Sequence, residues 1–314
     1  TLGVLDYNDR LAKDDTFESA HPHHHAKRKE MWNYFIEFGR KSHYQIYAIP
    51  DGQSKRQIFC SLPVDRPAYM HSFSVTERFF ILVEYPFRVN PEDILLKPGG
   101  FISNFKWHPE EPAIFNVIER STGKLLNKFE APAFFSFHHV NAYEEDANLI
   151  VDLISYPDPA VVYGTPPQEQ ERKLQRFIFD LSTGNIGNRV IAKTNLELPR
   201  INYQRHSGKP YCYVYGVDFP SDYDTQPIGL LKIKVTTGQI IKWQEDGCMA
   251  GEPIFVSHPD AKEEDDGVLL SLVFDHKRQN SYLLVLEAKS FQEIARATVP
   301  LAIPYGLHGM FTSL

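Results

Sequence analysis

The sequence has few cysteines and no excess of positive charge. Cys60, Cys212 and Cys248 are the only cysteines among 314 residues. Their odd number and wide spacing match neither a disulfide framework nor a zinc-binding CxxC pair, so we expect a reducing, cytoplasmic setting. The 33 Lys and Arg residues are outnumbered by 40 Asp and Glu residues, and the formal net charge is −7. Because no long basic run is flanked by aromatic residues, nucleic acid is not an expected partner.

A long hydrophobic run is also missing. No apolar stretch reaches the roughly 18 residues that a membrane-spanning helix needs, and no signal peptide is visible. A shorter apolar stretch runs from Ile94 to Phe105. It could make a peripheral membrane contact, or it could be an ordinary buried helix.

Short strands rich in β-branched and aromatic residues dominate what is present, which predicts an all-β protein. A hairpin recurs among them, with an alternating strand, a polar turn that ends in Thr-Gly, and a second strand. Three close copies turn at Gly123, Gly184 and Gly238, and two looser copies span residues 47–62 and 284–299. The glycine supplies the positive φ that such a tight turn needs. Repeats of this kind are typical of a β-propeller with inserted loops, and an open β-sandwich with similar hairpins is the alternative.

Four of the 13 histidines lie in contexts that need an explanation. His21 begins a His-Pro-His-His-His cluster, His71 and His138 lie inside aromatic runs, and His308 follows Tyr-Gly-Leu near the C-terminus. A buried imidazole needs a partner, and a metal ion is one such partner. Each histidine taken alone is better explained as a hydrogen-bonded structural residue.

A propeller changes that balance, because the inner strand of every blade points at the central axis and brings distant residues together there. Neutral imidazoles are good ligands for Fe(II), Zn(II) or Cu(II), and nearby carboxylates would orient the rings and offset the metal charge. Glu197 and Glu252 are the candidate acids, because each lies beside apolar strand residues. A surface acid at a strand end is the alternative for both.

At this point the sequence resembles the carotenoid cleavage oxygenases, a family that includes carotenoid and apocarotenoid dioxygenases, lignostilbene dioxygenases and the retinoid isomerase of the retinal pigment epithelium. The resemblance covers essentially the whole chain. It is carried by Ala-His-Pro-His at residues 20–23, Tyr-Met-His-Ser-Phe at 69–73, Phe-His-His-Val-Asn-Ala-Tyr-Glu-Glu at 137–145, Ile-Asn-Tyr-Gln at 201–204 with Gly-Lys-Pro-Tyr at 208–211, and Glu-Pro-Ile-Phe-Val-Ser-His-Pro-Asp-Ala at 252–261.

The resemblance implies a seven-bladed β-propeller with Fe(II) on its axis, bound by His21, His71, His138 and His308. It implies that Glu197 and Glu252 orient the ligands, and that family members carry a third such acid upstream of the first ligand. Thr1–Tyr7 reads as a strand entered part-way through a sheet. We therefore expect residues 1–314 to form a single carotenoid-oxygenase domain that lacks its N-terminal blades.

The activity implied by the resemblance is cleavage of a conjugated C=C bond by O₂ to give two carbonyl products, with no protein nucleophile or general base. An apolar stretch such as the one between Ile94 and Phe105 favours a membrane-dissolved carotenoid or apocarotenoid over a stilbene. Stilbene cleavage within the same family and a non-catalytic metal-binding propeller are the alternatives. Candidate substrate-binding aromatic residues are Phe73, Phe134, Phe137 and Tyr143, for which plain core packing is the competing role. The oligomeric state is not predicted.

Overall fold

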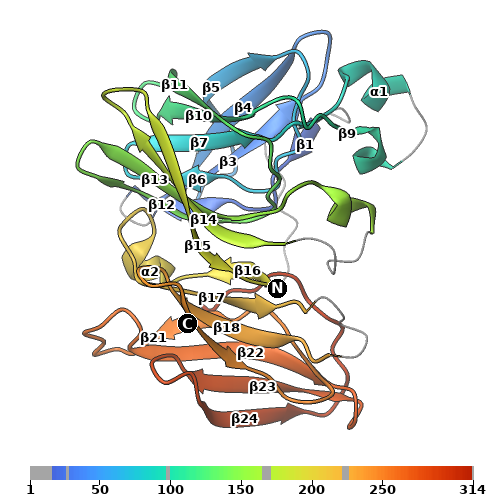
Figure 1. Ribbon diagram of the computed structural model, residues 1–314, viewed down its shortest axis with the longest axis vertical. Helices are drawn as coiled ribbons and strands as arrows, with labels where there is room; N and C mark the ends of the chain where they lie inside the picture. The colour runs from blue at the N-terminus through green and yellow to red at the C-terminus, as the bar shows by residue number, and fades with distance from the viewer. Residues whose placement is uncertain (1–15, 26–27, 97–99, 165–170, 221–225, 313–314) are drawn as a thin grey trace. The chain divides into compact units, whose positions relative to one another are not determined.

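The computed structural model describes residues 16–25, 28–96, 100–164, 171–220 and 226–312 (Figure 1). The strand expected at residues 1–7 lies outside these ranges. The chain divides into two compact units, Thr1–Phe137 and His138–Leu314. Each unit is described by itself below, and the expectation of one propeller domain stays a prediction.

Unit 1 contains two antiparallel sheets of the predicted kind. The first has the order β1-β3-β4-β5, with β2 also paired to β3, and the second has the order β6-β7-β10-β11. Their bounds are β1 Thr16–Glu18, β2 His23–His25, β3 Glu30–Glu37, β4 Ser42–Pro50, β5 Gln57–Val64, β6 Ser74–Val75, β7 Phe79–Glu84, β10 Ala113–Glu119 and β11 Lys124–Ala131.

Unit 2 contains three antiparallel sheets, with the orders β12-β13-β14-β15, β16-β17-β18-β19 and β20-β22-β23-β24, the last with β21 also paired to β22. Their bounds are β12 His139–Glu145, β13 Asn148–Ser155, β14 Lys173–Asp180, β15 Ile186–Lys193, β16 Leu196–Arg200, β17 Tyr213–Asp218, β18 Gly229–Lys234, β19 Gln239–Trp243, β20 Cys248–Ala250, β21 Ile254–Ser257, β22 Gly267–Asp275, β23 Asn280–Glu287 and β24 Glu293–Val299. Short helices interrupt the strands at η2 Ala160–Tyr163 and α2 Tyr203–His206.

The five predicted hairpins are confirmed as the last two strands of the five sheets. Gly123, Gly184 and Gly238 have φ values of 69°, 77° and 73°, and in each turn the glycine N–H donates to a carbonyl four residues earlier. A side chain is also excluded by space at two of them. A Cβ on Gly123 would lie 1.9 Å from the Phe59 carbonyl oxygen, and one on Gly238 would lie 2.3 Å from that of Ile191. The turn of one sheet therefore packs closely on the last strand of the sheet before it.

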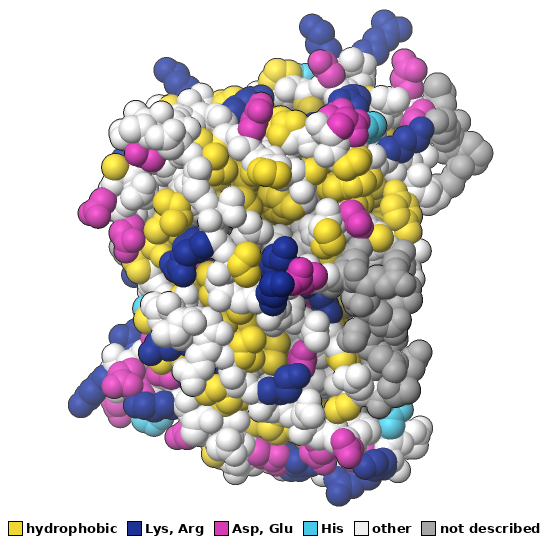
Figure 2. Space-filling model, viewed as in Figure 1, with side chains coloured by type: hydrophobic (Ala, Val, Ile, Leu, Met, Phe, Trp, Pro, Cys, Tyr) yellow, Lys and Arg dark blue, Asp and Glu magenta, His cyan; other side chains and the backbone are white. Residues whose placement is uncertain are grey.

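The described residues thus confirm an all-β fold built of repeated four-stranded meanders, the repeating unit of a propeller. Seven blades remain an implication of the family resemblance. In Figure 2, acidic and basic side chains alternate around β24, whose residues Glu293 and Arg296 form an ion pair. Such charges are typical of an edge strand that is protected from pairing with another chain.

The apolar stretch between Ile94 and Phe105 lies outside these sheets. It begins within α1 Pro91–Leu96 and contains η1 Phe101–Asn104, and the strands β8 Phe87–Arg88 and β9 Lys106–Trp107 flank this region and pair with each other. Phe105 is buried, and the Phe101 ring stacks on Phe17 with centroids 4.5 Å apart. Residues 97–99 lie outside the described ranges, so membrane contact by this stretch stays a prediction. Among the helices in the described ranges, none has both the length and the hydrophobicity needed to cross a bilayer.

Candidate metal centre

Each of the five sheets carries one predicted site residue at or next to its first strand. His21 lies between β1 and β2, His71 shortly before β6, His138 immediately before β12, Glu197 within β16, and Glu252 just after β20. His308 lies in the segment after β24. The repeated fold therefore places five of these residues at or near the first strand of a sheet, although they are far apart in the sequence.

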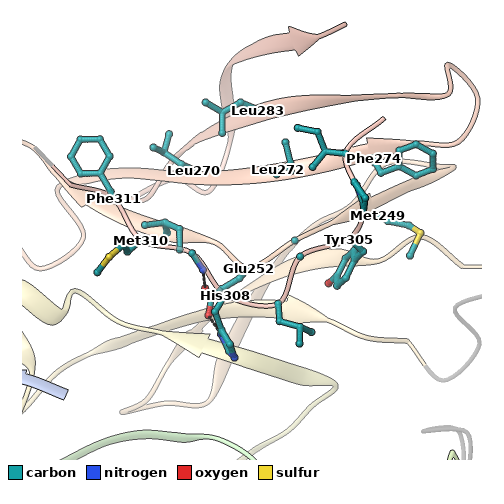
Figure 3. Close-up of a pocket in the computed structure, with 17 residues that line it drawn as sticks. Met249, Glu252, Leu270, Leu272, Phe274, Leu283, Tyr305, His308, Met310 and Phe311 are labelled. Atoms are coloured by element: carbon teal, nitrogen blue, oxygen red, sulfur yellow. Dashed lines mark hydrogen bonds and ion pairs between the residues drawn. The ribbon is translucent and has the colours of Figure 1, made fainter. Parts of the chain in front are cut away.

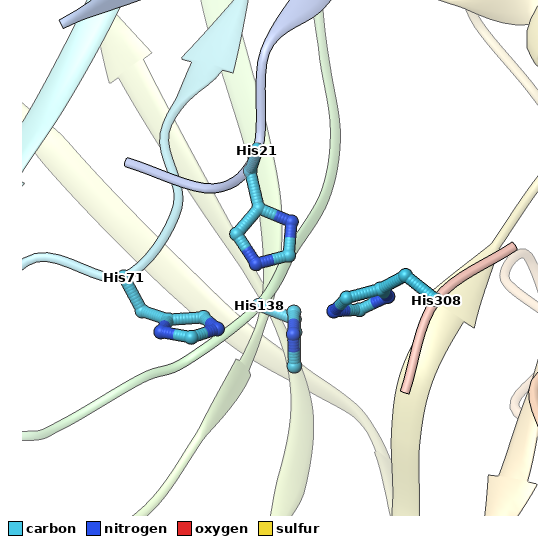
Figure 4. Close-up of side chains that lie close together, drawn as sticks. All are labelled: His21, His71, His138 and His308. Carbon is cyan, nitrogen blue, oxygen red and sulfur yellow. The ribbon is translucent and has the colours of Figure 1, made fainter. Parts of the chain in front are cut away.

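In unit 1, His21 and His71 lie beside each other, with ring centroids 4.6 Å apart (Figure 4). Buried Ser19 connects their backbones, because its hydroxyl donates to the His71 carbonyl oxygen at 2.9 Å and accepts from the His21 N–H at 3.2 Å. The Nδ1 atom of His71 lies 3.0 Å from the Tyr69 hydroxyl oxygen. The His71 ring thus has a hydroxyl partner, and Ser19 fixes the backbones of the two histidines relative to each other.

His23 is the competing member of the N-terminal histidine cluster. Burial lowers its pKa to about 4, although a hydrogen bond to the Phe73 backbone opposes this shift. His23 is therefore neutral near pH 7, and its Nε2–H donates to the Phe73 carbonyl oxygen at 3.1 Å. The Nε2 atom of His23 is thus engaged by the backbone, whereas His21 is the member of the motif whose ring lies beside that of His71.

In unit 2, His138 is held by a buried carboxylate. Its Nδ1 lies 2.5 Å from Oε2 of Glu197, which is 6% exposed. A carboxylate only accepts, so the bond requires a proton on Nδ1 and leaves Nε2 as the coordinating atom. Burial disfavours the charge on Glu197. The attraction of His138 and its hydrogen bond, followed by Tyr156 and Arg172, outweigh burial and hold the pKa of Glu197 below its ordinary value.

The backbone next to Glu197 is unusual. Leu198 has a φ of 49°, a left-handed conformation that is rare for a leucine. The pairing of β16 with β17 is irregular between Glu197 and Arg200, as at a β-bulge. As a result the Leu198 N–H donates to Oε2 of Glu197 at 3.0 Å, instead of to a neighbouring strand. The bulge thus helps to aim the carboxylate at His138.

His308 has the same kind of partner as His138. Its Nδ1 lies 3.0 Å from Oε1 of Glu252, and the Gly309 N–H donates to Oε2 at 3.0 Å. Arg200 forms a longer ion pair with Glu252 at 3.9 Å. The ring centroids of His138 and His308 lie 5.4 Å apart (Figure 4). The side chain of His308 is 35% exposed, against 12% for His138.

A pocket of about 330 Å³ lies next to His308 and Glu252, between the sheet of β20–β24 and the C-terminal segment (Figure 3). One wall is the half-buried face of β22 and β23, which presents Leu270, Leu272 and Leu283. The pocket therefore offers an apolar surface beside the Glu252–His308 pair.

The four predicted substrate-binding aromatic residues do not line this pocket. Phe73 is buried and stacks on Phe80 with centroids 4.4 Å apart, and Phe134 packs on Tyr85 at 5.3 Å. Phe137 is half-buried, with its ring 5.4 Å from that of His71. Tyr143, in unit 2, is buried under Arg176. The Phe137 ring thus lies beside a predicted ligand, and a substrate role for all four stays a prediction.

Sequence reasoning missed Tyr156, Leu198 and Arg200, which contact the two glutamates. Tyr156 directly follows a strand, and no sequence feature distinguishes it from an ordinary core residue. Leu198 has a left-handed backbone conformation, which its residue type does not predict. Tyr69 could have been found, because residues two apart on an extended chain point to the same side, and Tyr69 precedes His71 by that spacing.

The donor set fits a divalent transition metal. A protonated Nδ1 that is bonded to a carboxylate fixes the tautomer and raises the basicity of the other nitrogen, an arrangement common to histidines that bind metals. Glu197 and Glu252 also supply negative charge that would offset the charge of a metal bound by neutral imidazoles. The residues present are therefore compatible with a metal site.

Comparison with known proteins gives a consistent result. The family model described as RPE65, retinal pigment epithelial membrane protein, matches residues 1–313. The β,β-carotene 15,15′-dioxygenase of Homo sapiens is 33% identical over 99% of this chain, which spans 66% of that relative. The chloroplastic carotenoid cleavage dioxygenase 8 of Arabidopsis thaliana is 30% identical over 98% of this chain, which spans 58% of that relative.

Solved structures agree with these relatives. A crystal structure of an ACO/RPE65 chimera matches with a TM-score of 0.83 and 28% identity, covering 97% of this chain and 67% of the other. A cobalt-substituted Synechocystis ACO matches with a TM-score of 0.81 and 26% identity, covering 95% and 65%. The latter protein holds cobalt, as its name states. With the family model, the relatives and the fold in agreement, this chain belongs to the RPE65/carotenoid oxygenase family.

Proposed function

We propose that this chain is the iron-bearing part of a non-haem Fe(II) dioxygenase that cleaves a conjugated C=C bond of a carotenoid or apocarotenoid with O₂, giving two carbonyl products. Family membership and the names of the relatives support the reaction class. The observation that carries the proposal is the pair of buried glutamates, Glu197 and Glu252, each bonded to Nδ1 of a histidine.

In this proposal His21 and His71 from unit 1 and His138 and His308 from unit 2 hold the metal together. Support comes from the repeat, since His21, His71 and His138 lie next to the first strands of three successive sheets. In a propeller these strands line the axis. A set of four imidazoles is compatible with Fe(II).

Iron, when bound, supplies the activation of O₂. The chain holds and orients the ligands. Glu197 and Glu252 keep the proton on Nδ1 of His138 and His308, so that Nε2 of each ring is free to coordinate. Half-buried Phe137 beside His71 and the apolar pocket beside His308 would help to exclude water from the site. No protein nucleophile is required.

The metal site is tested by comparing His21→Ala with His24→Ala in the purified protein. Both residues lie in the same histidine cluster, but the exposed His24 is bonded to Asp51 at the surface, 2.9 Å away. We expect iron, measured by elemental analysis, to be lost in His21→Ala and retained in His24→Ala. Wild-type protein without iron, or equal iron in both variants, would contradict the proposal.

The substrate is tested by incubating iron-loaded protein in air with a carotenoid, an apocarotenal and a stilbene, and by looking for aldehyde products. Aldehydes from the carotenoid or apocarotenal are expected. Product from the stilbene alone would replace the substrate assignment. Iron retention without any product would favour a non-catalytic metal-binding protein.

A further inference from the structure

Tyr156 contacts the Glu197–His138 pair from the opposite side. It directly follows β13 and is 3% exposed. The strand holds it in place, because the Ile154 N–H donates to the His138 carbonyl oxygen at 3.0 Å. The Tyr156 hydroxyl donates to Oε1 of Glu197. All of these residues belong to unit 2.

The two oxygens of Glu197 therefore have different tasks. Oε2 accepts from Nδ1 of His138 and from the Leu198 N–H, and Oε1 accepts from Tyr156. A carboxylate anchored through one oxygen can still rotate about the bond to its side chain. A donor on the second oxygen fixes the carboxylate plane, and with it the direction of the hydrogen bond to the histidine.

Arg172 completes the arrangement behind Tyr156. Its guanidinium carbon lies 6.0 Å from the centre of the Tyr156 ring, and its own N–H group donates to the Phe219 carbonyl oxygen at 2.5 Å. Arg172 is 3% exposed. Burial, followed by the charge of Glu197, raises the pKa of Tyr156 well above its ordinary value, so the hydroxyl keeps its proton and remains a donor.

We propose that Tyr156 is a positioning residue for the metal centre, which acts through Glu197 to hold the His138 ring at the angle that coordination needs. This inference rests on the proposed function, because it requires that His138 binds a metal. It adds to that function a residue that acts through its hydrogen bond to Glu197.

Unit 2 offers a matched control. Tyr211 is 5% exposed, and its hydroxyl also donates to a buried carboxylate, Asp152, at 2.6 Å. Asp152 pairs with Arg176 at 2.8 and 2.7 Å, and not with a histidine. Tyr156→Phe and Tyr211→Phe therefore remove the same group from the same kind of partner, but only the first partner is bonded to a predicted ligand.

The test uses the purified chain loaded with Co(II), whose visible absorption reports ligand geometry, and follows metal loss to a chelator. We expect Tyr156→Phe to release Co(II) about 3- to 10-fold faster than wild type and to shift the absorption bands, an effect below that of changing the glutamate itself. Tyr211→Phe should match wild type in both readouts. Equal behaviour of the two variants would overturn the inference, whereas wild-type protein that binds no Co(II) would overturn the proposed metal site as well.

A double variant covers the case in which Tyr156→Phe does not fold. The variant that combines Tyr156→Phe with Glu197→Gln has no buried carboxylate that lacks the hydrogen bond from Tyr156. We therefore expect this variant to fold. If Tyr156 acts through Glu197 alone, the double variant should release Co(II) at the rate of Glu197→Gln. A much faster release would show that Tyr156 acts through another group, and the inference would then be wrong.

Discussion

The histidine pair of unit 1 and the histidine pair of unit 2 are supported in different ways. His138 and His308 are each bonded to a buried glutamate at 2.5 and 3.0 Å. In unit 1, His71 faces the hydroxyl of Tyr69, and Ser19 connects the backbones of His21 and His71. Each ring of the unit 2 pair thus has a carboxylate partner, whereas the His71 ring has a hydroxyl partner.

This difference bears on how a metal charge would be balanced. An anionic partner fixes the tautomer of an imidazole and makes its free nitrogen a stronger donor, whereas a hydroxyl can donate or accept and fixes the tautomer less firmly. Unit 2 therefore supplies charge compensation to its own two histidines through Glu197 and Glu252. The family resemblance implies a third acid upstream of His21, which would add to that compensation.

The largest effect is expected from Glu197→Gln. The substitution keeps the shape of the side chain but removes the charge from a site with 6% exposure. We expect metal release to become about 10- to 100-fold faster, measured with a chelator. Asp152→Asn is the control, because Asp152 is also buried but pairs with Arg176. It should lower thermal stability without changing metal release, and an equal effect of both changes would break the comparison.

A smaller effect is expected from Glu252→Gln. The side chain of His308 is 35% exposed, so water can replace part of the lost hydrogen bond, whereas His138 at 12% has less access to water. We expect metal release about 10-fold faster than wild type, near the lower limit for such partners. If Glu252→Gln accelerated metal release more than Glu197→Gln, the exposure of the histidine would not explain the difference between the two sites.

The smallest effect is expected from Tyr69→Phe. This change removes a neutral partner of His71, and the ring of residue 69 can keep its contacts with Phe87 and Phe105. We expect metal release to change by about 5-fold or less, a neutral hydrogen bond being worth roughly 1 kcal/mol. An effect as large as that of Glu197→Gln would show that the charge of the partner is not the important property.

Local patterns in the sequence were sufficient for the hairpins and the all-β class. The Thr-Gly turns at Gly123, Gly184 and Gly238 can be predicted from a few neighbouring residues, because the local turn geometry requires a positive φ at the glycine. The choice of His21 over His23 came from the family resemblance. In the structure the His21 ring lies beside that of His71, and Nε2 of His23 bonds to the Phe73 carbonyl oxygen.

Partners that lie far apart in the chain required the tertiary structure. The bonds from Glu197 to His138 and Tyr156 join three different strand ends. Leu198 beside them has a left-handed backbone conformation, which is unfavourable for a leucine. The sequence by itself determined which residue types recur and where the chain turns, because these depend on neighbours along the chain. Only the tertiary structure decided which histidines receive a carboxylate, because Glu197 and Glu252 lie 59 and 56 residues away from His138 and His308 in the chain.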